Sequence, residues 1–239
     1  MNVKYPLFIY LCSLLYTNSY LIPFLISNAL NNAPLNTRQL LDLAQNQFMT
    51  GKLEDSSNTF NQVAKIRPEL IPILWQRGIS LYFSHDYDSC QSQFEGDVAL
   101  NPSDTEEIVW AVLCAAKDGS ISNLENAQKS MLELRQPDKR PIMRNVYELF
   151  KISPNSDSSQ LALLKLLEEG DKDPNGGAYF YSRLYASLYK LAAGDNKNAL
   201  LYINDSLENS PYAKRFEKKD YMVAVAYNTQ NKLISLVNN

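Results

Sequence analysis

The sequence predicts an all-α protein, folded as a right-handed α-solenoid of stacked helix pairs whose later repeats are degenerate. A pattern recurs at a spacing of 34 positions, and it pairs Leu40 with Leu74, Ala44 with Gly78, Gly51 with His85, Phe60 with Phe94 and Pro68 with Pro102. Glycine is sparse, at 8 of 239 residues. No strand-like alternation of apolar and polar residues recurs, so helices are expected throughout.

Each unit of this pattern has a small residue near its eighth position, an aromatic residue near its 24th and a proline at its 32nd. In these features the chain resembles the tetratricopeptide repeat class. The resemblance implies that each unit is a helix, a tight turn and a second helix, which bury their apolar faces by stacking on neighbours. We expect such repeats over residues 36–137, and degenerate helical repeats with a capping helix over residues 138–239.

The first 30 residues are expected to form a separate targeting segment. Residues 5–37 carry no charged side chain, and an apolar run over residues 7–16 follows a short basic start. This pattern is typical of a signal peptide. We expect cleavage after Ser19 or Ala29, which would deliver the mature protein to a compartment derived from the secretory pathway, either outside the cell or in a plastid.

Two alternatives for residues 1–30 stay open. An uncleaved anchor running to about Leu30 would be long enough to span a bilayer, although Asn18 and Pro23 interrupt its apolar run. The chain would then be a membrane-tethered structural subunit, and only in that case is contact with a membrane expected. The other alternative is one stage of a two-stage plastid import sequence.

The turn between the two helices of a unit is expected at the 15th position, which is Gly51, His85 or Gly119. That position often needs a left-handed backbone, which glycine adopts freely and histidine tolerates better than most residues. We therefore interpret His85, the only histidine, as an exposed turn residue and not as a ligand.

The third unit is degenerate, because Ala127 and Pro137 fall outside the repeat register. Ser103 and Glu106 fit a capping box at its start. Beyond it, the apolar spacing predicts further helices at residues 141–150, 161–167, 179–193, 199–208 and 216–236.

The three cysteines suggest neither a disulfide framework nor a zinc site. Cys12 lies in the targeting segment, whereas Cys90 and Cys114 fall on expected helices, where a free cysteine usually behaves as a small buried apolar residue. An odd and scattered set fits no zinc-binding spacing. No metal and no cofactor are expected.

Charge and composition favour a protein that binds another protein. The formal net charge is −3, with 26 acidic and 23 basic side chains, and this balance argues against nucleic-acid binding, which needs a basic stripe. No nucleophile–base pair and no glycine-rich phosphate loop is evident. We therefore expect a non-enzymatic scaffold or adaptor for a protein partner.

The expected partner-binding surface is an aromatic concave groove formed by the first helix of each unit. Its candidate contact residues are Leu41, Phe48, Trp75, Ile79, Tyr82, Phe83 and Trp110. Aromatic side chains at such positions often act as anchors for an apolar peptide. The alternative is that the chain's own later helices, or a second copy in a homodimer, cover them, because an exposed patch of this size would be unusual in a monomer.

A second functional class stays open, namely an enzyme or a small-molecule-binding protein on the same helical frame. Its candidate pocket residues are Arg77, Asp97, Glu106 and Glu107. A closed polar pocket holding these side chains would favour this class, and an open apolar groove would favour the scaffold.

Several stretches resemble a group of tetratricopeptide-like proteins of plants and algae that are often thought to be directed to plastids. The matching stretches are Leu74–Tyr82, Gln93–Pro102 with Asp104–Glu107, Arg140–Met143 with Tyr147–Phe150, and Ser210–Tyr212 with Asp220–Met222. The resemblance implies a helical repeat fold and supplies no reaction.

Overall fold

The computed structural model describes residues 35–117 and 119–238. The chain divides into two compact parts, Met1–Arg38 and Gln39–Asn239. The second contains all the described helices apart from the first two residues of α3. The elements are α3 (Thr37–Met49), α4 (Leu53–Ile66), the 3-10 helix η1 (Pro68–Ile73), α5 (Trp75–Phe83), α6 (Tyr87–Leu100), α7 (Thr105–Ala116), α8 (Ile121–Lys129), α9 (Pro141–Phe150), α10 (Asp157–Asp171), α11 (Gly177–Ala192), α12 (Asn196–Glu208), α13 (Pro211–Phe216) and α14 (Tyr221–Asn238). The expected all-α class is confirmed for the described residues, since none of them lies in a strand.

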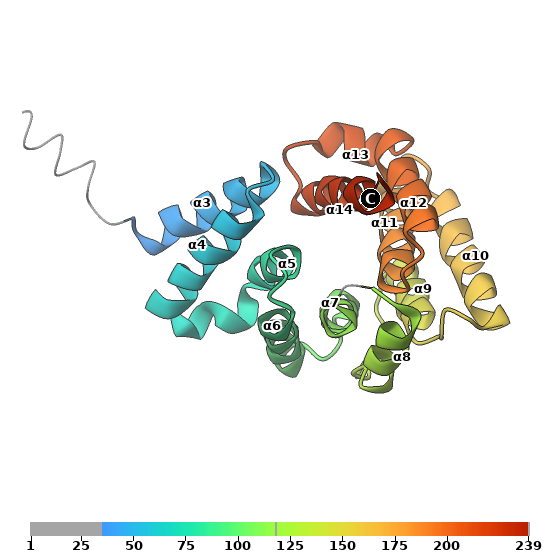
Figure 1. The fold of residues 1–239 in the computed structure, drawn as a ribbon, viewed down its shortest axis with the longest axis horizontal. Coiled ribbons are helices and arrows are strands. Elements are labelled where there is room, and N and C mark those ends of the chain that lie inside the picture. The colour runs from blue at the N-terminus through green and yellow to red at the C-terminus, as the bar shows by residue number, and fades with distance from the viewer. Residues whose placement is uncertain (1–34, 118, 239) are drawn as a thin grey trace, which may run out of the picture. The chain divides into compact units, whose positions relative to one another are not determined.

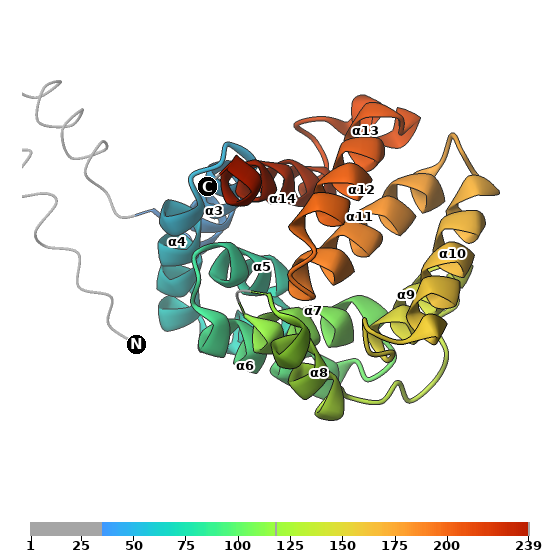
Figure 2. The same cartoon turned by 45° about the vertical axis from the view of Figure 1, so that its right-hand side comes forward.

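Most helices pack on their neighbours in sequence. The chain of contacts runs from α4 through α5, α6 and α7 to α8, and again from α9 through α10 and α11 to α12 (Figure 1). The last helix departs from this order. Helix α14 packs on α12 and lies between α12 on one side and α3 and α5 on the other, as two views show (Figures 1 and 2).

The tight turns adopt the expected left-handed backbone. The φ angles are 78° at Gly51, 64° at His85, 74° at Gly119 and 79° at Gly194. The interpretation of His85 as an exposed turn residue is confirmed, and its Nδ1 lies 2.8 Å from the hydroxyl of Tyr87. The same turn geometry therefore recurs between α3 and α4, α5 and α6, α7 and α8, and α11 and α12.

Small residues mark the places where helices approach most closely. A Cβ built on Gly78 in α5 would lie 2.6 Å from a ring carbon of Phe94 in α6, which is closer than atoms pack. Ala44 is fully buried, and the Ser56 hydroxyl of α4 donates a 2.8 Å hydrogen bond to its carbonyl. Ala44 and Gly78 are the small residues near the eighth position of the repeat, and both lie where helices approach closely.

Several boundaries differ from the expectations. A spacing of 34 residues from Thr37 places the start of the second repeat at Ile71, but residues 68–73 form a 3-10 helix and α5 begins at Trp75. Pro72 explains the difference, because its ring and its missing N–H disrupt a helix interior. The expected helix at 161–167 is the longer α10.

Two helix starts also need correction. The expected capping box at Ser103 is wrong, because the N-cap of α7 is Asp104, whose Oδ1 accepts the amide of Glu106 at 2.9 Å. The expected helix over 216–236 is interrupted between Phe216 and Tyr221, since Lys218 has a φ of 60° and Asp220 caps α14 through the amide of Met222 at 2.8 Å.

The expectation that Cys90 and Cys114 are free is wrong. The two residues form a disulfide that joins α6 to α7, with Cα atoms 5.8 Å apart. Both cysteines are fully buried. The odd and scattered set of cysteines did not indicate this pair. Partners on adjacent helices need no recurring spacing in sequence.

The expected targeting segment, residues 1–30, lies outside the described residues. Within the described part of the chain, no helix is both long enough and apolar enough to cross a membrane.

Candidate functional site

The expected concave groove is occupied by the chain's own C-terminal helix. The Tyr221 ring of α14 stacks on Phe48 with ring centroids 4.4 Å apart, and it meets Trp75 edge-on at 5.3 Å. Further along α14, Asn228 donates a 3.2 Å hydrogen bond to the carbonyl of Phe48, and the Lys232 amine lies 5.0 Å from the centre of the Tyr82 ring. Of the two kinds of cover considered above, the structure shows cover by a later helix.

Most of the expected contact residues are therefore inside the molecule. Five of them are at most 5% exposed, namely Phe48, Ile79, Tyr82, Phe83 and Trp110. Leu41 is partly buried against the small apolar cluster of Leu40, Val63 and Leu74. Trp75 is partly exposed. As contacts with a partner protein these seven residues stay a prediction, and Trp75 is the best placed to reach one.

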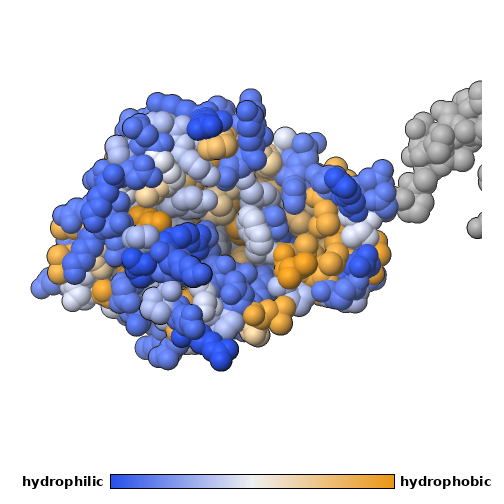
Figure 3. Space-filling model, turned by 180° about the vertical axis from the view of Figure 1, so that it is seen from behind, coloured by the Kyte–Doolittle hydropathy of each residue, from blue (hydrophilic) through white to orange (hydrophobic). Residues whose placement is uncertain are grey.

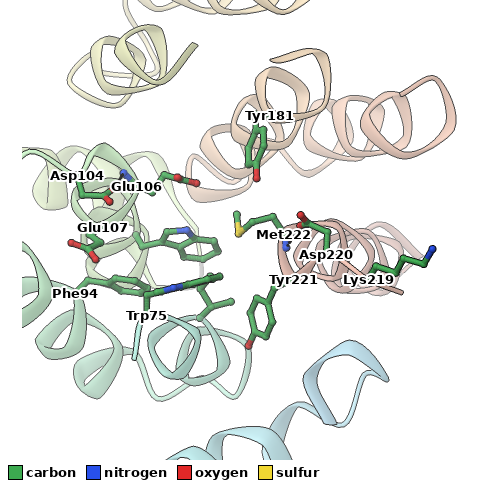
Figure 4. Close-up of a pocket in the computed structure, with 12 residues that line it drawn as sticks. Trp75, Phe94, Asp104, Glu106, Glu107, Tyr181, Lys219, Asp220, Tyr221 and Met222 are labelled. Atoms are coloured by element: carbon green, nitrogen blue, oxygen red, sulfur yellow. Dashed lines mark hydrogen bonds between the residues drawn. The ribbon is translucent and has the colours of Figure 1, made fainter. Parts of the chain in front are cut away.

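A cavity of about 430 Å³ lies at the place where α5, α6, α7, α11 and the start of α14 meet (Figure 4). Five aromatic residues, four acids and one lysine dominate its lining, and Ile79 and Met222 complete it. The full set is Trp75, Ile79, Phe94, Asp104, Glu106, Glu107, Trp110, Tyr181, Lys219, Asp220, Tyr221 and Met222.

The aromatic walls are held firmly in place. The Trp110 ring lies nearly parallel to Phe94, with centroids 6.0 Å apart, and Tyr82 meets it edge-on at 5.5 Å. The hydroxyl of Tyr221 donates to the carbonyl of Gln76 at 3.2 Å, so this residue offers the cavity its ring and not its hydroxyl. Such mutual packing fixes ring orientation.

Two of the four acids are committed to helix starts. Asp104 caps α7, and Asp220 caps α14. Asp220 also accepts a 2.8 Å hydrogen bond from the hydroxyl of Tyr212. The N-terminal amides of both helices are thus directed to their own side chains, and these carboxylates are compensated by helix ends.

Glu106 is compensated by charge. Its Oε2 pairs with the Arg140 guanidinium at 2.6 Å, and its Oε1 accepts the hydroxyl proton of Tyr185 at 2.8 Å. Arg140 also pairs with Asp138 at 2.8 Å. This network joins α7 to α11 and to the segment that precedes α9.

Glu107 is the acid without such compensation. Its Oε2 is buried with no hydrogen-bond partner among the described residues. Burial, together with the neighbouring carboxyls of Asp104, Asp97 and Glu106, raises the pKa of Glu107 to about 8. At neutral pH this carboxyl therefore holds its proton most of the time.

Asp97 lies close enough to influence Glu107 but does not line the cavity. It is 1% exposed, its Oδ1 accepts a 2.8 Å hydrogen bond from Gln93, and its Oδ2 has no partner among the described residues. Burial raises the pKa of Asp97 to about 6. Behind the cavity wall there is thus a second carboxyl with a raised pKa, whose neutral form predominates only below about pH 6.

The four residues expected for a small-molecule pocket do not form one site. Glu106 and Glu107 line the cavity, whereas Arg77 donates to Asn61 at 2.8 Å and to Gln93 at 2.6 Å and lines a separate surface hollow. Within residues 35–117 and 119–238, no group of three or more histidine, cysteine, aspartate or glutamate side chains could hold a metal ion.

The sequence did not indicate the contribution of the C-terminal segment to this site, which is Tyr181, Asp220, Tyr221 and Met222. A signal was present, because Asp220 stands directly before an apolar run and so fits a helix N-cap. That signal locates the start of α14, but it does not show that this start folds back onto α5.

The face opposite to that of Figure 1 is largely hydrophilic, and its hydrophobic colour gathers towards the α3–α4 end (Figure 3). Exposed apolar side chains of that end include Leu43, Ile66 and Ile73. The homodimer considered above stays a prediction.

No protein-family model matches the sequence, no curated protein matches it, and no solved structure matches its fold. The geometry of the described residues is therefore the basis for the function proposed below.

Proposed function

We propose that this protein is a non-enzymatic protein-binding scaffold or adaptor, built as a right-handed solenoid of tetratricopeptide-type helix pairs. The recurrent left-handed turns at Gly51, His85, Gly119 and Gly194 support this architecture. The close approach of Gly78 to Phe94 supports it as well, since helix pairs of this class need small residues where they cross.

The surface that meets the partner is the cavity rather than the groove. One observation carries this proposal: both tryptophans of the chain line a cavity of about 430 Å³, and Trp75 remains partly exposed there. Tryptophan is enriched among the residues that dominate binding energies, and a cavity beside it can receive a projecting side chain. Because α14 fills the groove, the cavity is the aromatic recess that stays accessible.

The disulfide supports the expected location. Disulfides persist in oxidising compartments and are rare in the cytosol of mesophiles. The Cys90–Cys114 bond therefore favours a compartment reached through a membrane, whether secreted or plastid, over the cytosol.

Affinity capture from the native source tests the proposal. Tagged wild-type protein should retain a defined protein that Trp75→Ala loses, whereas Ile73→Ala should retain it, because Ile73 is 64% exposed and lies outside the cavity. Circular dichroism melts should show that Trp75→Ala still folds. Equal capture by both variants would contradict the cavity as the binding surface.

A small-molecule-binding protein on the same frame is the second candidate. It is favoured by the presence of Glu106 and Glu107, two of the residues expected for such a site, in one cavity. Native mass spectrometry of protein purified from its source would separate the candidates. A stoichiometric bound small molecule supports the second, and its absence together with a captured protein supports the first.

A further inference from the structure

The cavity combines features that suit one ligand chemistry. Trp75 and Tyr221 form two walls at nearly a right angle, with an interplanar angle of 83°. The hydroxyl of Tyr221 is engaged on α5, so its ring is what it presents. Trp110 lines the same cavity with its ring supported by Phe94. Aromatic faces attract cations through their quadrupoles, and tryptophan does so most strongly.

The charges of the lining point the same way. Four carboxyl groups and one amine line the cavity. That amine, on Lys219, extends away from the other labelled side chains (Figure 4). Asp104 and Asp220 are compensated by helix starts, and Glu106 by Arg140. Glu107 alone contributes a buried oxygen that lacks a hydrogen-bond partner among the described residues. A buried polar atom of this kind needs a donor, and a ligand can supply it.

Other ligand classes fit less well. An anion would meet the carboxyls, and the N-terminal amides of α7 and α14 are already directed to their capping aspartates. A purely apolar ligand would leave the Glu107 oxygen buried and unpaired, which is costly. A bare metal ion finds no suitable group of side chains in the described residues.

We propose that this cavity binds an organic cation, an alkylammonium or guanidinium group, which packs against the rings of Trp75 and Trp110 and is neutralised by the carboxylate of Glu107. This inference rests on the proposed function in that it names the chemical group which the partner presents. The group can be the end of a lysine or arginine side chain or a free small amine, because both carry the same chemistry.

Binding of the cation is coupled to release of a proton. The pKa of Glu107 is raised to about 8, so a cation that needs its carboxylate displaces the proton at lower pH. Affinity should rise by up to about tenfold per pH unit below pH 8 and level off above it. The charged groups around Glu107 are Asp97 from α6, Asp104 and Glu106 from the start of α7, and Lys219 and Asp220 from the start of α14.

Tryptophan fluorescence tests the proposal directly, because the only two tryptophans of the chain line the cavity. The full protein is titrated at pH 8.5 and constant ionic strength with 3,3-dimethylbutan-1-amine, which is protonated at this pH, with N-acetyl-lysine methylamide and with N-acetyl-arginine methylamide. The neutral probe is 3,3-dimethylbutan-1-ol, which has the carbon skeleton of the amine without its charge. We expect a saturable change with at least one cation, and binding of the neutral probe at least about tenfold weaker.

The variant Glu107→Gln keeps the shape of the side chain and removes its charge. It should weaken cation binding by about tenfold or more at pH 8.5 and abolish the dependence on pH. Glu133→Gln is the matched control, because Glu133 is exposed and lies outside the cavity, and it should bind like the wild type.

Binding of the capped amino acids but not of 3,3-dimethylbutan-1-amine assigns the site to a partner's side chain, and the reverse result assigns it to a free small amine. The inference is overturned if no cation gives a saturable change, if the neutral probe binds equally well, or if Glu107→Gln leaves the affinity unchanged. Failure of the proposed function looks different. In that case the cations bind and Glu107→Gln weakens them, but Trp75→Ala does not alter protein capture.

Discussion

Asn228 in α14 donates a 3.2 Å hydrogen bond to the backbone carbonyl of Phe48 in α3, a residue 180 positions earlier in the chain. Both residues are buried. The bond joins the last helix to the first described one. The Phe48 carbonyl also accepts the backbone amide of Gly51 at 3.0 Å in the turn after α3, so Asn228 is its second donor. The Asn228 bond therefore helps to hold α14 over the aromatic residues of α3 and α5.

The Asn228 bond should be measurable as stability. Asn228→Ala is expected to lower the free energy of unfolding by about 0.5–1.5 kcal/mol, because it removes one buried hydrogen bond while the Phe48 carbonyl keeps the Gly51 amide. Asn231→Ala removes the same side chain from an exposed position of the same helix and should change stability by less than about 0.5 kcal/mol. Urea denaturation followed by circular dichroism gives both values. Equal effects would show that α14 is not held at Asn228.

Substitution of alanine for two glycines of α5 and α6 should change the stability of the protein in opposite directions. The Cβ of Gly78→Ala would meet Phe94 at 2.6 Å, so we expect destabilisation by about 1–3 kcal/mol from overpacking. A Cβ on Gly96 meets no atom within 4 Å, so Gly96→Ala should stabilise α6 by up to about 1 kcal/mol. Thermal melts of the two variants test this, and a stable Gly78→Ala protein would contradict the assigned α5–α6 packing.

Stability should fall as pH rises from 5 to 9. The pKa of Glu107 increases from its ordinary value of 4.5 to about 8 on folding. Protonation of Glu107 therefore stabilises the folded state, and this contribution is complete below pH 4.5. It is lost as the pH rises through 8. Because the site is half-buried, solvent screening reduces the effect to on the order of 1–2 kcal/mol. Melting temperatures measured across this range should decrease for the wild type.

Glu107→Gln provides the control for that pH dependence. This variant should melt at a more constant temperature between pH 6 and 9 and be more stable than the wild type at pH 9. Asp97 contributes to the pH dependence of stability in a lower pH range, because its pKa rises on folding from 3.8 to about 6. A wild-type melting temperature that increases from pH 6 to 9 would show that Glu107 is ionised in the folded protein.

The disulfide should contribute to stability through the unfolded chain. Cys90 and Cys114 enclose a loop of 24 residues, and loss of the bond is expected to cost about 3 kcal/mol. Denaturation of the wild type with and without reductant, beside the double variant Cys90→Ala and Cys114→Ala, measures the effect. Alkylation of the unreduced, denatured protein should modify neither cysteine, and modification of both would refute the bond.

Local features of the fold could be predicted from the sequence, because they depend on local chemistry. The left-handed turns at Gly51 and His85 and the close approach at Gly78 follow from residue size and backbone preference within one unit. The break at Pro72 was equally local, but the repeat register outweighed it in the prediction of a continuous helix.

The site could be predicted only in part. The sequence indicated that Trp75 and Trp110 share one face, and both do line one cavity. It did not indicate that Tyr221 would stack on Phe48, since the packing of an amphipathic C-terminal helix is decided by apolar surface far away in the chain. The same reason explains why the sequence left open whether a partner or a later helix of the chain fills the groove.

Site-directed photo-cross-linking tests the central claim most directly, because it records where a partner touches the protein. A photo-reactive phenylalanine analogue is placed at Lys219, which is exposed at the cavity, or at Leu201, which is 65% exposed and outside it. We expect one discrete protein adduct from position 219, reduced by an excess of the binding cation, and none from position 201. Adducts from position 201 alone, or equal adducts from both positions, would contradict the claim that the cavity is the binding surface.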